Sequence, residues 1–403
     1  MGTRDTTGTA GAFGADEADG TVGTAGQAEL TGQERAKWAE AVWAKIEAKI
    51  SRTSRRIGAT FPYVSIHGGK YNAADADWWT NGFWPGMLWM LYRETGEARY
   101  RDIAEACEAK LDEPLHSFDV LHHDVGFMWS LSAVADYKLT GSEQAKRRAL
   151  TAASHLAGRF NPKGGFLRAW LGEGREGWAI VDCLMNLPLL YWASRTTGDP
   201  RFRHIAQLHA DTALKEFLRP DGSAYHIVCF DPETGERTGA LGGQGYAPDS
   251  AWSRGTAWAL YGMALSHKYT GDVRYLDAAK RTAHYFVAQL PEDCVPYYDF
   301  RAPFEDGMGK DSSASAIAAS GLLEIAALAP PSEASSYRRA ACRILEALDA
   351  YYGAWDDPEE EGLLYMGTAN FPKRAYVNVP IIYGDYFFME AVAKLRGSYV
   401  SFW

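Results

Sequence analysis

Two kinds of helical segment alternate along the chain. One kind is apolar on almost every face, and the other carries alanine with leucine or isoleucine at helical spacing and charged residues between them. The apolar segments lie at about residues 82–94, 124–139, 182–196, 252–269, 313–328 and 384–396. The amphipathic segments lie at about residues 33–52, 99–112, 143–159, 200–217, 273–290 and 335–352. The chain is therefore predicted to contain six pairs of helices.

The ends of these segments support the same pairing. A Thr-Gly pair ends an apolar segment at residues 95–96, 140–141, 197–198 and 270–271, and glycine just past a helix favours a left-handed cap. A helix that is apolar on all sides belongs in an interior, whereas an amphipathic helix can face water. We therefore predict an all-α fold, an (α/α)₆ barrel in which six inner helices are surrounded by six outer ones. An extended solenoid of helix pairs is the alternative.

This toroid is predicted to be a single catalytic domain over residues 29–403. Residues 1–28 are rich in glycine, threonine, alanine and acidic residues, and we expect them to form a mobile tail. Stretches in which apolar and polar residues alternate with a period of two are rare in the sequence. Strands are therefore expected only as short pieces in long loops, such as residues 224–230.

In a ring of alternating hairpins, the inner helices point the same way and their amino-terminal ends gather at one mouth. The residues at these ends are aromatic, acidic and basic side chains with histidine, which is a typical composition for an active site. They are Trp78, Trp79, Asn81, His122, His123, Asp124, Asp182, Trp252, Ser253, Arg254, Trp258, Asp311, Ser312, Tyr383 and Asp385. The mouth of the ring is therefore the predicted site.

Several of these residues also have purely structural interpretations. Asp182 begins an apolar run and has the alternative role of a helix N-cap. Arg254 is an alternative ion-pair partner for Asp249 or Asp311. Adjacent histidine side chains diverge, so at most one of the pair at 122–123 is expected to face a ligand. His226, Trp79, Trp170 and Trp258 are by default core residues.

The amino-acid composition limits the classes of partner that the protein is expected to bind. The 403 residues include 14 Trp and 22 Tyr, which suits a cavity lined with flat rings, as sugar sites are. A net charge of −10 argues against binding to nucleic acid or to an anionic membrane. Five scattered cysteines without a Cys-x-x-Cys motif predict reduced thiols and a cytoplasmic protein. The amino terminus shows no charged-then-apolar leader, and no apolar run is long enough to span a bilayer.

No metal and no cofactor are expected. His122, Asp124 and Asp182 lack a recognised metal-ligand spacing, and the motif His-Glu-x-x-His is absent. The glycine-rich stretch 239–249 lacks the Lys-Ser/Thr ending of a phosphate loop. Gln244 at its centre favours contact with a ligand, and an ordinary flexible loop is the alternative.

Five groups of residues follow one another along the chain: 79–86 (WTNGFWPG), 123–127 (HDVGF), 182–188 (DCLMNLP), 243–245 (GQG) with 252–255 (WSRG), and 310–314 (KDSSA). Together they resemble the unsaturated glucuronyl hydrolases of glycoside hydrolase family 88. The resemblance runs from about Trp38 to the end of the chain.

The resemblance implies an (α/α)₆ barrel that hydrolyses the unsaturated oligosaccharides left by polysaccharide lyases, whose terminal uronate carries a C4=C5 double bond. It places the general acid/base at Asp182 and an assisting carboxylate at Asp124. It places substrate contacts at Trp79, His123, Trp170, His226, Gln244, Arg254 and Trp258.

The chemistry can also be argued from the substrate. The terminal sugar is a vinyl ether, so a proton at C4 gives an oxocarbenium ion at C5, to which water adds. One aspartate can supply the proton and then accept one from water if it starts protonated. A helix amino terminus lowers the pKa of Asp182, whereas a neighbouring carboxylate and aromatic surroundings raise that pKa. We therefore expect Asp124 and Asp182 to lie close together and to share a proton.

We expect the other site residues to hold the sugar. His226, Gln244 and Arg254 are the expected donors to the substrate carboxylate, and Trp79 and Trp258 are expected to stack on sugar rings. Unsaturated rhamnogalacturonyl hydrolysis, ordinary inverting glycoside cleavage, sugar epimerisation and sugar binding without catalysis are the alternatives. The preferred glycan stays open among chondroitin, hyaluronan, heparin and gellan fragments. Residues 367–374, with cations at 373 and 374, are candidates for contact with a second sugar or a sulfate.

Overall fold

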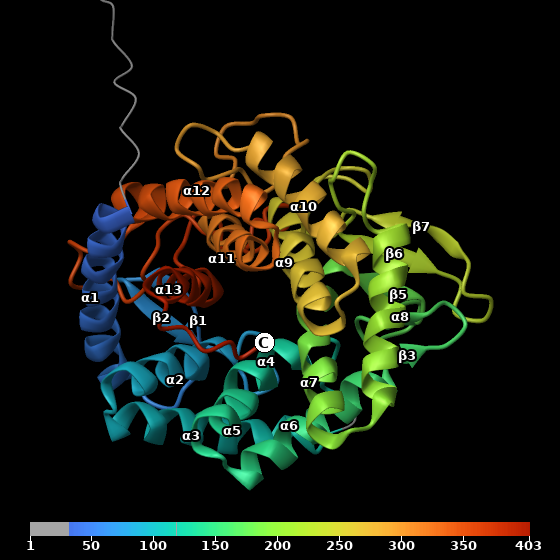
Figure 1. Cartoon of the computed structure of the whole chain (residues 1–403), viewed down its shortest axis with the longest axis horizontal. Helices are drawn as coiled ribbons and strands as arrows, with labels where there is room; N and C mark the ends of the chain where they lie inside the picture. The colour runs from blue at the N-terminus through green and yellow to red at the C-terminus, as the bar shows by residue number, and fades with distance from the viewer. Residues whose placement is uncertain (1–31, 118) are drawn as a thin grey trace, which may run out of the picture.

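The computed structural model describes residues 32–117 and 119–403, so the predicted tail at residues 1–28 lies outside the described part of the chain. In that part, helices form two concentric rings (Figure 1). The inner ring contains α2 (Phe83–Thr95), α4 (Val125–Trp129) with α5 (Ala135–Thr140), α7 (Leu187–Thr197), α9 (Ser253–Thr270), α11 (Ser312–Leu328) and α13 (Ile382–Arg396). The outer ring contains α1 (Gly32–Ile57), α3 (Ala98–Leu115), α6 (Glu143–Gly158), α8 (Pro200–Glu216), α10 (Val273–Ala288) and α12 (Pro331–Ala347).

The ring is closed. The last inner helix, α13, packs against α11 on one side and against α2, the first inner helix, on the other. This closure confirms the predicted (α/α)₆ toroid and excludes the extended solenoid.

Burial follows the predicted division between the two rings. Every residue of α11 from Ser312 to Ala326 is buried, whereas α10 buries one stripe that includes Tyr275, Ala279 and Phe286. All four predicted glycine caps adopt a left-handed conformation, with φ between 70° and 79°. They are Gly96, Gly141, Gly198 and Gly271. Each cap donates its backbone N–H to the carbonyl four residues earlier.

The second inner position differs from the continuous helix that the pattern predicts. A π-helical turn, η1 (Ser130–Val134), separates α4 from α5. The backbone of Gly82 lies so close that a Cβ atom there would be 2.0 Å from the carbonyl oxygen of Phe127. The carbonyl of Met128 accepts a hydrogen bond of 2.6 Å from the Ser132 hydroxyl. The widened turn thus lies directly after a close contact between neighbouring inner helices.

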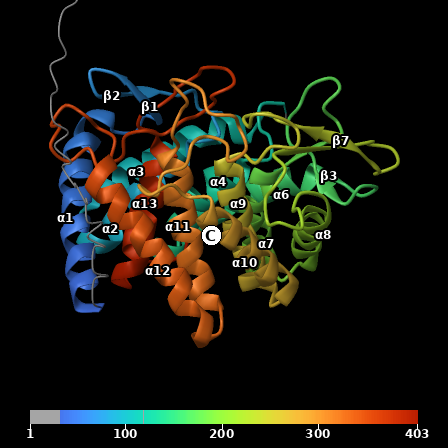
Figure 2. The same ribbon diagram turned by 90° about the horizontal axis from the view of Figure 1, so that it is seen from above.

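Short strands and long loops lie at one end of the rings (Figure 2). The strands are β1 (Pro62–His67) with β2 (Lys70–Ala73), β3 (Phe160–Asn161) with β4 (Phe166–Leu167), and the sheet β5 (Trp178–Ile180), β6 (Ile227–Phe230) and β7 (Arg237–Leu241). All pairs are antiparallel. The strand β6 falls within the stretch for which a short strand was expected.

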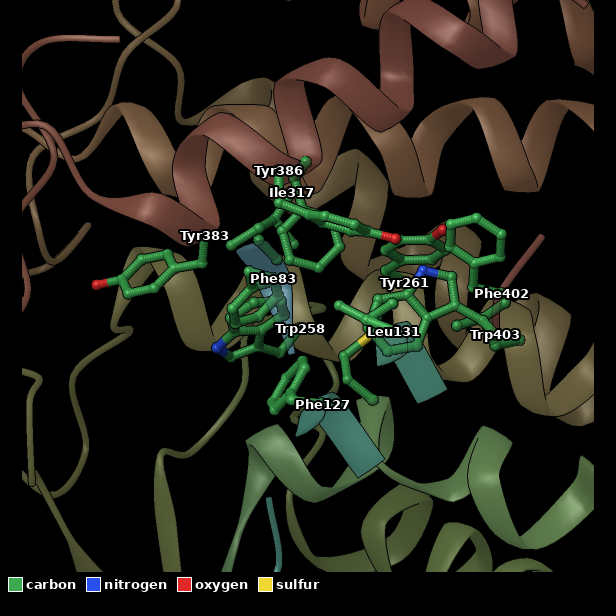
Figure 3. Packing of buried hydrophobic residues seen from close by; sticks show 14 of the residues in the cluster. Phe83, Phe127, Leu131, Trp258, Tyr261, Ile317, Tyr383, Tyr386, Phe402 and Trp403 are labelled. Carbon is green, nitrogen blue, oxygen red and sulfur yellow. The ribbon is translucent and has the colours of Figure 1, made fainter. Parts of the chain in front are cut away.

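Aromatic side chains fill the centre of the inner ring. Figure 3 shows Phe83, Phe127, Trp258 and Tyr261 packed in one cluster together with Trp403. All five cysteines are free, as predicted. In the part of the chain that the structure describes, no helix is both long and apolar enough to cross a bilayer.

Candidate active site

The three-stranded sheet positions three parts of the candidate site at one of its ends. Ile180 of β5 pairs with Ile227 of β6, which pairs with Leu241 of β7. Because neighbouring strands are antiparallel, the residues just after β5, just before β6 and just after β7 lie together. These residues are Asp182, His226 and the turn at 242–244, and the N–H of residue 181 donates to the carbonyl of His226 over 3.0 Å.

Asp182 is a buried acid with an uncommitted oxygen. It lies inside a short 3₁₀ helix, η2 (Val181–Met185), whose N-cap is Ile180, so Asp182 is not the N-cap that the structural alternative proposed. Its side chain is buried, and its Oδ1 has no hydrogen-bond partner among the described residues. Burial raises the pKa of Asp182 well above its usual value, the charge of Asp124 raises this pKa further, and the charge of Arg254 opposes both. Burial and the neighbouring charge of Asp124 therefore both favour the protonated form of this carboxyl group.

Asp124 is the opposite kind of acid. Its Oδ2 lies 3.2 Å from Nδ1 of His122 and 3.3 Å from Nε2 of His123. Its Oδ1 accepts a hydrogen bond of 3.1 Å from the amide of Asn186. Burial alone would raise the pKa of Asp124, but the two histidines outweigh burial and hold this pKa below its usual value. Asp124 is therefore a charged group with both oxygens in contact with polar partners.

Two predictions about these residues are wrong. The side chains of His122 and His123 do not diverge, because both reach the same oxygen of Asp124. Asp124 and Asp182 influence one another electrostatically, but their pKa values move in opposite directions and no hydrogen bond joins their carboxyl groups in the described part of the chain. The opposite shifts favour the proton on Asp182 and oppose a proton shared between the two acids.

Asn186 joins the two acids and is the residue that sequence reasoning missed. Its amide nitrogen donates to Oδ1 of Asp124 and, over 3.2 Å, to the backbone carbonyl of Asp182. Its Oδ1 accepts the N–H of Phe127 over 2.8 Å. Asn186 lies in the DCLMNLP stretch, but its role depends on the contact between two inner helices. A Cβ atom at Gly126 would lie 2.5 Å from the Cα of Asn186, so only glycine permits this contact.

His226 and the loop after β7 form the next part of the site. Nδ1 of His226 lies 2.9 Å from the carbonyl oxygen of Gly242 and 3.0 Å from the backbone nitrogen of Gln244. Burial lowers the pKa of His226 to about 3, so the ring is neutral at pH 7. Nε2 has no partner among the described residues. When Nδ1 accepts the Gln244 N–H, Nε2 carries the hydrogen and is a donor toward the site.

Arg254 acts on the site through its neighbours. Its guanidinium pairs with Asp311 and donates to the carbonyl oxygens of Thr368 (2.6 Å) and Ala369 (2.7 Å). It also donates to Oε1 of Gln244 over 2.6 Å. These four bonds occupy both terminal nitrogens of the guanidinium. The alternative interpretation of Arg254 as an ion-pair partner of Asp311 is therefore correct. Since Oε1 of Gln244 faces Arg254, the amide nitrogen of Gln244 is oriented away from it and can serve another acceptor.

The predicted aromatic contacts divide into three environments. The half-buried ring of Trp79 lies 5.2 Å from Tyr383 and 5.5 Å from Phe127, between centroids. Trp258 is fully buried with its ring 5.0 Å from that of Phe127, and its Nε1 has no partner in the described chain (Figure 3). Trp170 packs on the small cluster of the β5–β7 sheet that contains Ile180 and Ile227. The structure thus joins Trp79 and Trp258 through Phe127 and places Trp170 on the sheet that carries Asp182 and His226 at its end.

Comparisons with known proteins show which family the chain resembles in sequence and in fold. The unsaturated glucuronyl hydrolase of Bacillus sp. (strain GL1) is 40% identical over 359 residues, which cover 88% of this chain and 95% of that protein. An unsaturated chondroitin disaccharide hydrolase of Streptococcus pyogenes serotype M1 is 35% identical and covers 85% of this chain and 87% of its own.

The crystal structure of the Bacillus protein superposes with a TM-score of 0.84 and covers 90% of this chain and 97% of its own. That of a Streptococcus agalactiae unsaturated glucuronyl hydrolase superposes with a TM-score of 0.86 at 31% identity, covering 93% and 94% of the two chains. The model of Glycosyl Hydrolase Family 88 matches residues 51–365. The chain, with its buried acid beside a charged one at the mouth of a closed helical ring, belongs to glycosyl hydrolase family 88.

Proposed function

We propose that this protein removes the terminal 4,5-unsaturated uronic acid from oligosaccharides made by polysaccharide lyases. The observation that carries the proposal is the buried carboxyl group of Asp182, whose Oδ1 has no partner among the described residues and whose pKa is raised by burial and by the charge of Asp124. A proton donor that is neutral at pH 7 is what the hydration of a vinyl ether requires. The names of the relatives support the same substrate class.

Asp182 has both proton-transfer roles in the proposed mechanism. Its carboxyl proton goes to C4 of the unsaturated sugar, and the double-bond electrons form the new C–H bond. The positive charge that develops at C5 and the ring oxygen is stabilised by the resulting carboxylate and by Asp124. Water adds at C5 and gives its proton to Asp182, so the acid is regenerated. The hemiketal then opens and releases the rest of the oligosaccharide.

The substrate carboxylate is recognised by neutral donors in front of a cation. Nε2 of His226 and the amide nitrogen of Gln244 are the donors, and Arg254 supplies positive charge from behind Gln244. A carboxylate bound in a buried site needs such partners because desolvation is costly. Trp79 presents a partly exposed ring for stacking on the sugar, whereas the ring of Trp258 is fully buried and does not offer the stacking surface that was expected of it.

Glycosaminoglycan fragments are the proposed substrates. An Asp-to-Asn variant of the Streptococcus agalactiae enzyme, 29% identical, has been crystallised with dGlcA-GalNAc6S. Another structural relative, also 29% identical, is described as specific for heparin. We propose a chondroitin- or heparin-type disaccharide for this chain.

The test is a panel of lyase-made disaccharides of chondroitin, hyaluronan, heparin, gellan and rhamnogalacturonan, followed by ultraviolet absorbance of the enol ether. We expect absorbance to fall with a glycosaminoglycan disaccharide and to persist when Asp182→Asn replaces the wild type. Turnover restricted to the rhamnogalacturonan product would overturn the glucuronyl assignment. Cleavage of saturated disaccharides would indicate an ordinary glycosidase instead.

A further inference from the structure

Three consecutive residues bring three potential metal ligands together beside the acid. The Nδ1 atom of His122 and Nε2 of His123 both approach Oδ2 of Asp124, at 3.2 and 3.3 Å. These three ligand atoms lie within 4.8 Å of one another. Around an ion with ligand bonds of about 2.0–2.2 Å, neighbouring ligand atoms lie roughly 3 Å apart. The three side chains therefore need only small shifts to hold an ion.

The ligand types select the kind of ion. Two imidazoles and one carboxylate suit Zn²⁺, Co²⁺, Ni²⁺ or Cu²⁺, whereas Ca²⁺ takes six to eight oxygen ligands and Mg²⁺ needs mainly oxygen. The amide of Asn186 holds the other oxygen of Asp124, so Oδ2 already points toward both histidines. Nδ1 of His123 has no acceptor among the described residues. Loss of such an outer hydrogen bond typically weakens metal binding about 10–100-fold, so moderate affinity is expected.

An ion can reach this group through a pocket that His122 lines. A pocket of about 700 Å³ lies between α6 and the β3–β4 hairpin, and His122 lines it. The side chain of His122 is 24% exposed, whereas that of His123 is 1% exposed. His155 of α6 lines the same pocket but bonds the carbonyl of Leu115, so it offers a matched control.

We propose that His122, His123 and Asp124 form a binding site for one divalent transition-metal ion of the Zn²⁺ type, and that the bound ion inhibits the enzyme reversibly. The inhibition rests on the proposed function. An ion on Asp124 cancels the negative charge beside Asp182 and adds positive charge where the oxocarbenium ion forms. The reaction rate should fall while the substrate carboxylate is still bound by the His226–Gln244 part of the site, so kcat should change more than KM.

The binding test uses Co²⁺ as the probe, with the full chain first treated with EDTA. We expect one Co²⁺ per chain, seen as visible absorbance and as heat in calorimetry, and displacement of that absorbance by Zn²⁺. His122→Ala should weaken Co²⁺ binding at least about 10-fold, in line with the loss of one of three ligands, whereas His155→Ala should leave binding unchanged. Absence of stoichiometric binding, or equal binding by His122→Ala and wild type, would overturn the site.

The kinetic test adds Zn²⁺ to the active enzyme and then removes it with EDTA. We expect a fall in kcat that EDTA reverses and that His155→Ala reproduces, with the inhibition constant raised about 10-fold or more in His122→Ala. Inhibition of equal strength in His122→Ala would contradict inhibition through this site. Because Co²⁺ absorbance needs no turnover, a chain that binds one ion yet acts on no disaccharide would disprove the proposed function while leaving the metal site supported.

Discussion

Two buried carboxyl groups of the inner ring have opposite surroundings. Asp182, at the mouth, has an oxygen without a partner among the described residues. Glu390 lies two turns along α13, on the order of 12 Å from the start of that helix, and is fully buried. Its Oε1 accepts from the hydroxyls of Tyr261 and Ser320, and its Oε2 accepts from Tyr386, Tyr399 and the indole N–H of Trp403.

In the proposed mechanism, this difference separates a structural acid from the proton donor. A buried acid that only holds a fold together uses its lone pairs on internal donors, because each unsatisfied group is costly. Glu390 receives five donors from three inner helices and from the segment after α13, so it ties the ring to residues 399–403. Asp182 bears the cost of burial without that compensation, and its raised pKa expresses this cost. The comparison predicts that changes at Asp182 alter rate and that changes at Glu390 alter stability.

The largest expected effect is that of Asp182→Asn on rate. Removing the only proton donor in the proposed mechanism should lower kcat about 10³-fold, within the range for general acid–base catalysis. Steady-state assays on the preferred disaccharide measure the loss. Retention of more than a tenth of the wild-type kcat would contradict the assignment of Asp182.

The same substitution should not reduce stability. Because the pKa of Asp182 is raised in the folded state, its contribution to stability is fully present below the unfolded pKa and is lost as pH rises through the folded pKa. Asn cannot titrate, so the variant should lack this loss and be at least as stable as wild type at pH 8. Urea unfolding at pH 5 and at pH 8 tests the sign, since a variant less stable than wild type at pH 8 would contradict it.

The next effect is that of Asp124→Asn, which removes the neighbouring charge. We expect kcat to fall about 10²-fold, at the lower end of the range for general acid–base catalysis. Asp182 must be protonated to act, and the charge of Asp124 raises its pKa, so the alkaline limb of the kcat/KM profile should move to lower pH. The profile is measured from pH 5 to 10. The control is Glu176→Gln, which removes a charge that does not shift the pKa of Asp182 and should leave the alkaline limb in place. An alkaline limb that does not move in Asp124→Asn would contradict the electrostatic coupling between Asp124 and Asp182.

Much of the fold could be predicted because the signals were local. The whole-helix apolar segments, the amphipathic partners and the glycine caps each depend on residues within about one helical turn or two. The π-helical turn at Ser130–Val134 could not be predicted, because it accompanies the contact of Gly82 with the next inner helix. The β5–β6–β7 sheet was also missed as a unit, since its strands are only three to five residues long and come from separate loops.

The site was predictable in its membership more than in its arrangement. The positions of Asp182 and Asp124 at one mouth followed from the helix directions, whereas His226 was assigned through the family resemblance. The protonation states did not, because they depend on His122, His123 and Asn186, whose side chains meet Asp124 only in the folded ring. An acidic residue in the middle of the apolar segment 384–396 was the available signal for Glu390, and its five donors come from four separate elements.

A smaller effect, on stability alone, is expected for Glu390→Gln. The glutamine amide keeps one acceptor oxygen. Its N–H₂ group faces hydroxyls or the indole that donate to the Glu390 carboxylate in the wild type. With two donors left unsatisfied at about 1–3 kcal/mol each, the free energy of unfolding should fall by about 2–6 kcal/mol. Urea unfolding measures the loss of stability. The kcat per folded molecule should stay within about twofold of wild type, because all five donors to Glu390 are side chains of the protein itself, away from the candidate site. A large fall in kcat at unchanged stability would make Glu390 a functional acid and break the comparison.

The smallest effect is that of Trp403→Phe, which keeps an aromatic ring but loses the indole N–H. The ring of Trp403 stacks on Phe387 at 5.9 Å and 2°, so phenylalanine preserves much of this contact, whereas the bond of 2.7 Å to Glu390 disappears. We expect a loss of about 1–2 kcal/mol in the free energy of unfolding, the worth of one buried hydrogen bond, with kcat unchanged. In the Glu390→Gln background the same substitution should cost less, because the acceptor is already impaired, and a double-mutant cycle measures this coupling. Equal costs in the two backgrounds would mean that Trp403 stabilises the ring by packing alone, and that Glu390 is held by the four hydroxyls without it.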